Sequence, residues 1–318
     1  MRSLTLAPLL ALVLAPLGCG SPTPGPTASY SAEQLNAITG RIVDEDGPTP
    51  AATAAPMPSS DGGGEAEPPP PPQPAGLRVI HASPDRTLAS VSAFLDDSAV
   101  AAVQGLAYKG VAGYVELTPG DHAVVLRRAN AAAGAPPALS VRTDTLDPGE
   151  RSTAIVYGVT VGTARLALAA GTDLLGLPEE GKARVRFFHA LVGLGAVDLC
   201  LPGTAARPAA PNQPAVAATP ASTLFANVAY GAFGSAQGGA YVDLPSGSPV
   251  VLQVRAQNAR PCTGPVRGTV TVTPPSASVV TTVAVGRVVG APAVPRELLV
   301  CLDAPVSGAP SCAAVAIR

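Results

Sequence analysis

From Leu77 to the end of the chain, short runs of Val, Leu, Ala and Tyr alternate with clusters of Gly, Pro, Asp and Ser. Strands separated by turns produce this spacing, whereas an amphipathic helix needs apolar residues at every third or fourth position. No long stripe of that helical period occurs, so the pattern predicts an all-β fold. Residues 114–127 and 241–258 each place turn residues between two strand-like runs and predict β-hairpins.

The predicted strands recur in two copies along the chain. LRVIHA, which contains His81, matches VRFFHA, which contains His189, and GLAYKG with Tyr108 matches NVAYGA with Tyr230. A copy of about 100 residues buries roughly two-thirds of the surface of its unfolded chain, which is enough for a core of its own. The repeat therefore predicts two tandem β-sandwiches.

The offset between the copies is 106 residues at Val91 and 122 residues at Tyr108, so the second copy is longer. The additional residues fall in the Pro-rich segment 204–222, which we expect to be a surface loop. The first sandwich is expected over residues 77–176 and the second over 183–318, with the joint at 176–182.

The N-terminus begins with Arg2 and a short apolar run, which is typical of a secretory signal and too short for a bilayer of ~30 Å. Gly18-Cys19 follows, as at the end of a bacterial lipoprotein signal, where cleavage exposes the cysteine for acylation. We expect residues 1–18 to be the signal peptide and residues 19–76 to be a lipid-anchored, disordered, Pro-rich tether. Gly20 favours the outer membrane, with the periplasmic and the cell-surface face both open. The alternative is ordinary secretion with Cys19 discarded or free.

Four further cysteines, an even number, suit an exported chain, in which disulfides persist. They allow three pairings. We favour Cys200 with Cys262, which would join two strand ends, and Cys301 with Cys312, which would close a local hairpin. A zinc site is the alternative, but the chain has no C-x-x-C pair beside a histidine.

The charge of the chain argues against nucleic acid as a partner. The net charge is −2 and the isoelectric point is near 5.9, so no basic field is available to hold a phosphate backbone.

The sequence also lacks common catalytic motifs: no G-x-S-x-G elbow, H-E-x-x-H motif or phosphate-binding glycine loop occurs. We expect no cofactor and no metal.

The two histidines of the repeat admit two interpretations. We expect the strand in VIHASPD to end near His81, with Ser83-Pro84-Asp85 turning the chain, so that the ring bonds a backbone carbonyl or the hydroxyl of Tyr108. His189 would occupy the equivalent position, and the matched residues Tyr108 and Tyr230 suit core or sheet-corner roles. The alternative is a metal-dependent hydrolase in which His81 or His189 acts with carboxylates from loops.

The stretches LRVIHASPD, VSAFLD, GLAYKGVAGYVELTPG and HAVVL resemble the bacterial repeat family known as domain of unknown function 4397. The resemblance covers Leu77 to about Asp173, and more weakly Ala183 to about Asp303. It implies exported, often lipid-anchored proteins with tandem immunoglobulin-like sandwiches, and it brings no established reaction.

The second copy replaces Ser-Pro-Asp with Leu191, Val192 and Gly193, which argues against a shared catalytic use. We therefore expect a non-enzymatic lipoprotein of the cell envelope that acts as a binding, adhesion or structural module for an envelope protein or a polysaccharide. A passive spacer within a surface assembly is the alternative.

Overall fold

The computed structural model describes residues 71–318, apart from residues 97, 133–134, 210, 212, 236–239, 291–292 and 304–309. The expected signal peptide, Cys19 and nearly all of the expected tether lie outside the described residues. The first strand begins at Ala75, two residues before the boundary expected from the sequence. The described part contains no helix that is long and apolar enough to cross a membrane.

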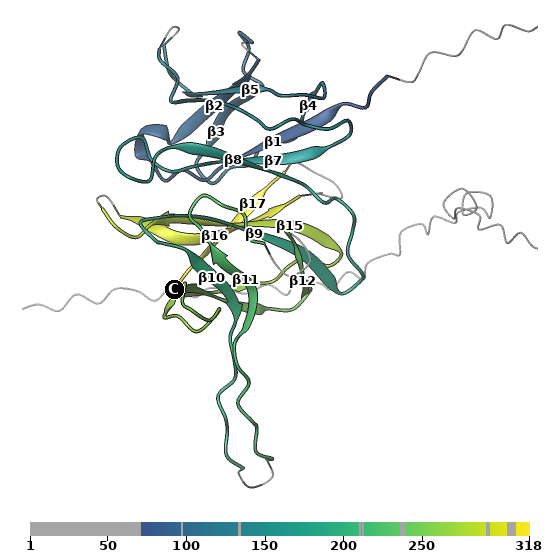
Figure 1. The fold of residues 1–318 in the computed structure, drawn as a ribbon, viewed down its shortest axis with the longest axis vertical. Coiled ribbons are helices and arrows are strands. Elements are labelled where there is room, and N and C mark those ends of the chain that lie inside the picture. Colours follow the sequence, from purple (N-terminus) through teal and green to yellow (C-terminus); the bar gives the residue numbers. More distant parts are fainter. Residues whose placement is uncertain are drawn as a thin grey trace, which may run out of the picture. The chain divides into compact units, whose positions relative to one another are not determined.

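The first copy forms a β-sandwich of two four-stranded sheets, with strand orders β4-β1-β7-β8 and β3-β2-β5-β6 (Figure 1). Strands β1 and β7 run parallel, and the other neighbours are antiparallel. Leu77 and Val79 of β1 point into the core, whereas Arg78 and Ile80 point to the opposite face of their sheet. The strands are β1 (Ala75–His81), β2 (Ser90–Leu95), β3 (Val103–Ala107), β4 (Val115–Leu117), β5 (Ala123–Arg128), β6 (Leu139–Arg142), β7 (Arg151–Tyr157) and β8 (Ala167–Thr172), with a 3-10 turn η1 (Arg86–Leu88).

The second copy repeats this topology strand for strand and adds one edge strand. Its sheets have the orders β12-β9-β15-β16-β17 and β11-β10-β13-β14, and β9 and β15 are parallel, as β1 and β7 are. The expectation of an all-β fold with two tandem sandwiches is confirmed. The strands are β9 (Lys182–Val192), β10 (Val197–Leu201), β11 (Ser222–Val228), β12 (Val242–Pro245), β13 (Val250–Ala256), β14 (Val266–Val272), β15 (Ser278–Arg287), β16 (Val294–Leu302) and β17 (Cys312–Ala316).

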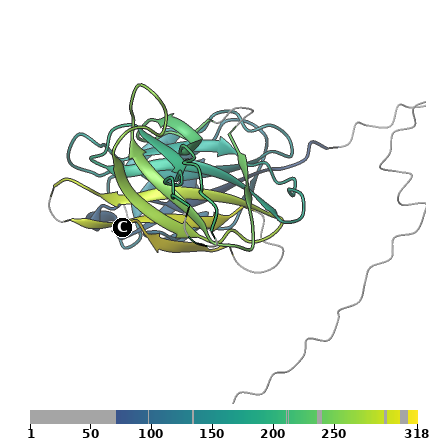
Figure 2. The ribbon, with the colours of Figure 1, turned by 90° about the horizontal axis from the view of Figure 1, so that it is seen from below.

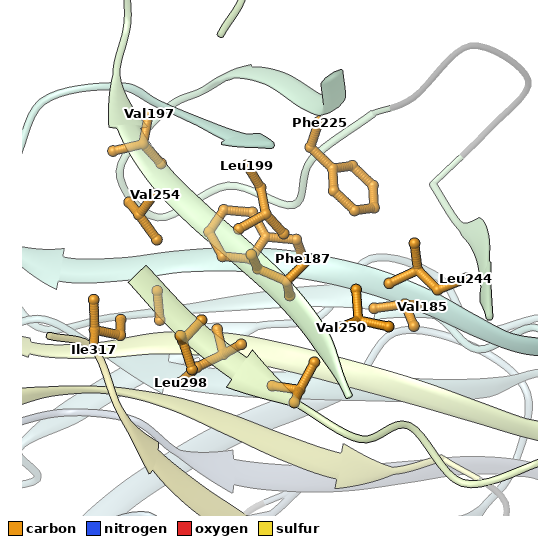
Figure 3. Close-up of a cluster of buried hydrophobic side chains, with 14 of the residues drawn as sticks. Val185, Phe187, Val197, Leu199, Phe225, Leu244, Val250, Val254, Leu298 and Ile317 are labelled. Carbon is orange, nitrogen blue, oxygen red and sulfur yellow. The ribbon is translucent and has the colours of Figure 1, made fainter. Parts of the chain in front are cut away.

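Each sandwich has its own apolar core. In the second, Phe187 of β9 faces Phe225 of β11 with ring centroids 6.1 Å apart, and Leu199 and Leu298 pack around them (Figure 3). A third apolar cluster joins the two inner sheets, the one with β1 and β7 and the one with β9 and β15. Ile80, Ile155, Phe188, Val283 and Leu299 are fully buried in it. Both sandwiches belong to one compact unit.

The two predicted hairpins are wrong. Strand β4 pairs with β1, whereas β5 pairs with β2 and β6 in the other sheet, and β12 and β13 are separated in the same way. The turn at Pro119-Gly120 carries the chain from one sheet to the other, and Gly120 has a φ of +134° and pairs with Leu146. The turn residues allow a sheet-crossing corner as well as a hairpin, and β5 beyond this corner buries Val124 and Leu126 in the core of the first sandwich.

The disulfides pair as favoured. Cys301 of β16 and Cys312 of β17 are register partners in an antiparallel pair, with Cα atoms 4.1 Å apart. Cys200 of β10 bonds Cys262 with Cα atoms 5.9 Å apart. Cys262 lies in the loop before β14 rather than at a strand end.

Candidate functional site

The first repeat histidine is a buried link between two backbone segments. His81 ends β1, and its Nε2 lies 2.7 Å from the carbonyl oxygen of Leu88. Its Nδ1 accepts a hydrogen bond from the backbone N–H of Ser83 at 3.4 Å, which assigns the ring proton to Nε2. Burial lowers the pKa of His81, against the opposing effect of the bond to Leu88, so the ring is neutral near pH 7.

The second repeat histidine has the same arrangement. Nε2 of His189 lies 2.9 Å from the carbonyl oxygen of Gly195, and Nδ1 accepts from the N–H of Leu191 at 3.3 Å. Burial also lowers the pKa of His189. The rings of Tyr108 and Tyr230 lie edge-on to His81 and His189, with centroids 6.1 and 5.8 Å away, but the tyrosine hydroxyls are not the histidine partners.

The nitrogens of both rings are thus engaged with the backbone, and none of the described carboxylates bonds either ring as the hydrolase hypothesis requires. The residues that the structure describes include no group of three or more His, Cys, Asp or Glu side chains placed for a metal ion. A His–Asp contact does occur at His122, which the sequence did not single out: its Nδ1 lies 2.6 Å from Oδ2 of Asp96. Its Nε2 bonds the carbonyl of Thr118, so this pair braces the corner between β4 and β5.

The Ser-Pro-Asp turn after His81 fastens two loops of the first sandwich together. The hydroxyl of Ser83 donates to the carbonyl of Gly158 at 2.6 Å. Asp85 accepts from both the N–H and the hydroxyl of Thr87 at 2.9 and 2.8 Å, and from those of Thr160 at 2.6 and 2.5 Å. Partial burial would raise the pKa of Asp85, but the bonds from Thr160 and Thr87 outweigh it and lower the pKa to about 2. We call this set of bonds the Asp85 staple.

The second copy has no counterpart of the Asp85 staple. Strand β9 continues through Val192, and Gly193 turns with a φ of +85°. A Cβ on Gly193 would come within 2.1 Å of the side chain of Val289, so the loop between β15 and β16 closes directly on this turn. The segment that follows the repeat histidine therefore differs between the two copies, although His81 and His189 themselves are equivalent.

Beside the Asp85 staple lies a half-open groove of about 640 Å³. Its polar lining comes from η1, from the start of β2, from the end of β5 with the residues after it, and from the loop after β7. The apolar part of the lining consists of Ala and Pro residues, and Arg127 donates a hydrogen bond to the carbonyl of one of them, Ala135. The polar residues that line this groove are Arg86, Thr87, Ser90, Arg128, Asn130 and Thr160.

A buried ionic cluster joins the two inner sheets. Arg78 of β1 pairs with Asp303, which follows β16, and Arg186 of β9 pairs with Asp173, which follows β8. All four side chains are at most 1% exposed. Each aspartate belongs to the opposite sandwich from its arginine, so the cluster has reciprocal contacts like those of a two-fold interface.

Matched neighbours complete the cluster on both sides. The guanidinium Nε of Arg78 donates to Thr153 and that of Arg186 donates to Thr281, both at 2.7 Å. Tyr114 donates to Asp173, and Tyr241 donates to Asp303 at 3.3 Å. The charges cancel and the hydrogen-bonding groups are used within the protein. We interpret the cluster as the structural link between the sandwiches.

A paired ribbon projects from the second sandwich between β10 and β11 (Figures 1 and 2). Thr204 and Thr219 bond through backbone and hydroxyl groups, and the backbones of Arg207 and Val216 exchange two bonds of 2.9 Å. The expected surface loop is therefore a ribbon of two backbone segments that are hydrogen-bonded to each other. The described residues from 203 to 220 are exposed.

The base of the ribbon is braced. Cys200 lies immediately before it and is bonded to Cys262. Asp198 accepts from the N–H groups of Asn227 and Cys262, both at 2.8 Å, and both donors have a positive φ. In the first copy Ser92 holds the N–H of Gly105 at 3.1 Å in the same way. Asp198 reaches the additional donor on the disulfide loop and so links the ribbon base to it.

Comparison with known proteins agrees with the resemblance in the strand motifs. Residues 75–200 match the family model described as domain of unknown function (DUF4397). The match spans the first sandwich and strands β9 and β10 of the second. No curated protein matches the chain. The family description assigns no activity, so the function must be argued from the geometry of the sites.

Proposed function

We propose that the chain is a non-enzymatic, exported and lipid-anchored binding module of the cell envelope, and that the ribbon of residues 202–221 recognises another envelope protein. The observation that carries this proposal is the contrast between the braced base and the exposed length of the ribbon. The fold does not need the ribbon, because the first copy makes the same connection between β2 and β3 with only residues 96–102. A long exposed segment on a rigid scaffold is typical of recognition elements.

Export is supported by the two disulfides, because such bonds persist in oxidising compartments. The apolar run before Gly18-Cys19 supports a lipid anchor at Cys19. Gly20 after the cysteine favours the outer membrane, with a tether between the lipid and the first sandwich.

A non-enzymatic role is supported by how the buried polar groups are used. Arg78, Arg186, Asp173 and Asp303 neutralise one another, and His81 and His189 bond backbone groups. A general base must reach the proton that it abstracts, which these buried groups do not. A passive spacer remains the competing function and is separated from binding by the following experiment.

The test compares the full chain with a variant lacking residues 204–221, both produced in the native cells with a C-terminal tag. After cross-linking in the cells, affinity capture and mass spectrometry should recover a discrete protein with the full chain and lose it with the variant. Val100→Ser, an exposed change in the corresponding β2–β3 connection of the first sandwich, serves as the matched control and should leave the partner in place. If all three chains recover the same abundant neighbours, the chain is a spacer.

The folding of the variant must be checked in the same experiment. The described ribbon residues are exposed, so its removal should leave the melting temperature within a few degrees of the parent. Both disulfides should remain, as shown by thiol counting under denaturing conditions.

A further inference from the structure

We infer that the groove beside the Asp85 staple binds an acidic carbohydrate, whose carboxylates pair with Arg86 and Arg128. This is a second site on the other sandwich from the ribbon, and it goes beyond the proposed recognition of an envelope protein. The inference rests on charge, on the chemistry of the lining and on the contrast between the two copies.

The groove holds positive charge that the protein does not neutralise. Arg86 and Arg128 are exposed, and within the described residues neither guanidinium forms an ion pair. The neighbouring carboxylate of Asp85 is ionised, but it is not among the residues that line the groove, and its two oxygens already accept four hydrogen bonds from Thr87 and Thr160. A guanidinium offers a planar pair of N–H donors that fits a carboxylate. An anion in the groove therefore meets two cations in a chain whose net charge is −2.

The rest of the lining favours a sugar over an acidic protein segment. Protein partners gain most of their affinity from large side chains buried in well-packed pockets, whereas the apolar lining here consists of Ala and Pro. The hydroxyl oxygens of Thr87 and Thr160 already donate their hydrogens to Asp85, so they face a ligand as acceptors. Ser90 and the amide of Asn130 add donors and acceptors. Such groups match the many hydroxyls of a sugar ring, and the arginines add a requirement for carboxylates.

The Asp85 staple holds two walls of the groove in place before any ligand arrives. It joins η1, which carries Arg86 and Thr87, to the loop that carries Thr160. Preorganisation of this kind lowers the entropy cost of binding. In the second copy the Ser-Pro-Asp turn is absent and Val289 closes on Gly193. The Ser-Pro-Asp turn thus occurs in the copy whose groove carries Arg86 and Arg128.

The experiment titrates the full chain, produced without its N-terminal signal, with oligogalacturonate by calorimetry at low and at physiological salt. We expect binding that weakens with salt and that falls at least about tenfold when Arg86→Gln and Arg128→Gln are combined. Arg267→Gln, which removes an exposed arginine of β14 outside the groove and the ribbon, should leave the affinity unchanged. The same oligomer with its carboxylates methyl-esterified should not bind.

Three results would overturn the inference: no binding at millimolar oligogalacturonate, equal binding by the double variant, or equally tight binding of polyglutamate, which would assign the groove to acidic polypeptides. The double variant should keep its melting temperature, because both side chains are exposed. Deletion of residues 204–221 should leave the sugar affinity intact, so a failure of this inference and a failure of the proposed ribbon function are told apart.

Discussion

Arg78 of the first sandwich forms its buried ion pair with Asp303 of the second, and the two residues are separated by 225 positions along the chain. Arg186 and Asp173 form the same pair in the opposite direction. Each copy therefore supplies one cation and one anion to its neighbour. The sandwiches are held together by these ion pairs as well as by the apolar cluster around Ile80 and Phe188. Separating them would leave the four charged side chains without their partners from the other copy.

Breaking one pair should destabilise the whole unit. Arg78→Met leaves Asp303 buried without its main partner, and we expect the free energy of unfolding to fall by about 3–5 kcal/mol in urea denaturation. Adding Asp303→Asn removes the unpaired charge and should restore part of the loss, since a neutral buried amide is easier to satisfy. A single variant that loses less than about 1 kcal/mol would contradict this role of the pair.

Acid should weaken the fold through the two repeat histidines. Burial lowers the pKa of His81 and of His189 in the folded chain, below the value of 6.5 for a free side chain. As the pH falls through 6.5, these two histidines bind protons in the unfolded chain but stay neutral in the folded chain until the pH is lower. The stability is therefore fully present above pH 6.5 and declines below it, by up to about 1.4 kcal/mol per pH unit for each histidine.

Melting curves of the parent, His81→Gln and His189→Gln between pH 5 and 8 check this expectation. Each variant should melt at a lower temperature at pH 8, because a buried partner of Leu88 or Gly195 is lost or weakened, and each should show a shallower decline toward pH 5. Similar effects from both variants are expected because the positions are equivalent. A variant of unchanged stability that lost a bound metal would instead support the metal-site interpretation.

Removal of the Asp85 staple should loosen one end of the first sandwich. Asp85→Ala deletes the acceptor of four hydrogen bonds from Thr87 and Thr160, and we expect a cost of about 1–3 kcal/mol. Hydrogen exchange read by mass spectrometry should accelerate at residues 85–89 and 158–165. Exchange around Gly193 in the second copy is the internal reference and should not change.

The two disulfides should contribute unequally. In the chain-entropy description, a bond between residues 62 apart restricts the unfolded chain more than one between residues 11 apart. Replacing Cys200 and Cys262 by Ser should therefore cost about 4 kcal/mol, and replacing Cys301 and Cys312 about 3 kcal/mol, measured by denaturation of each double variant. A larger loss of stability on removing the Cys301–Cys312 bond would mean that this bond stabilises β17 by more than its effect on the entropy of the unfolded chain.

The lipid anchor is tested by Cys19→Ser. The parent should sediment with the membrane fraction and incorporate labelled palmitate, whereas the variant should do neither, because it lacks the thiol that carries the lipid. A variant that sediments like the parent would show that something other than Cys19 holds the chain at the membrane.

The architecture was predictable from the sequence because the evidence for it is local and occurs twice. Alternating apolar runs indicated the strands, and matched strands such as LRVIHA and VRFFHA indicated the two sandwiches. The even number of cysteines after Cys19 indicated the disulfides, and spacing was enough to favour Cys301 with Cys312. The partner of a strand is not local information, so the Pro119-Gly120 corner was mistaken for a hairpin turn.

The ionic cluster was also missed, although a signal was present. Arg78 and Arg186 occupy the same position in the two copies, each between two large apolar residues of its strand, where a buried charge has to be paired. Asp173 and Asp303 follow equivalent strands. The sequence alone does not show that each arginine takes the aspartate of the other copy, because the face shared by the inner sheets is decided by packing between residues far apart in the chain.

The reciprocal pairing resembles the contact of a two-fold symmetric dimer, but the two halves that it joins need not have the same sequence. In a dimer of two identical chains, every change of sequence appears twice, on both halves. Here both halves of the contact belong to one polypeptide. The two copies can therefore differ in sequence at positions outside Arg78, Arg186 and their partners without disturbing the contact. The longer connection after β10 and the Asp85 turn before β2 are divergences of this kind, and each occurs once per molecule.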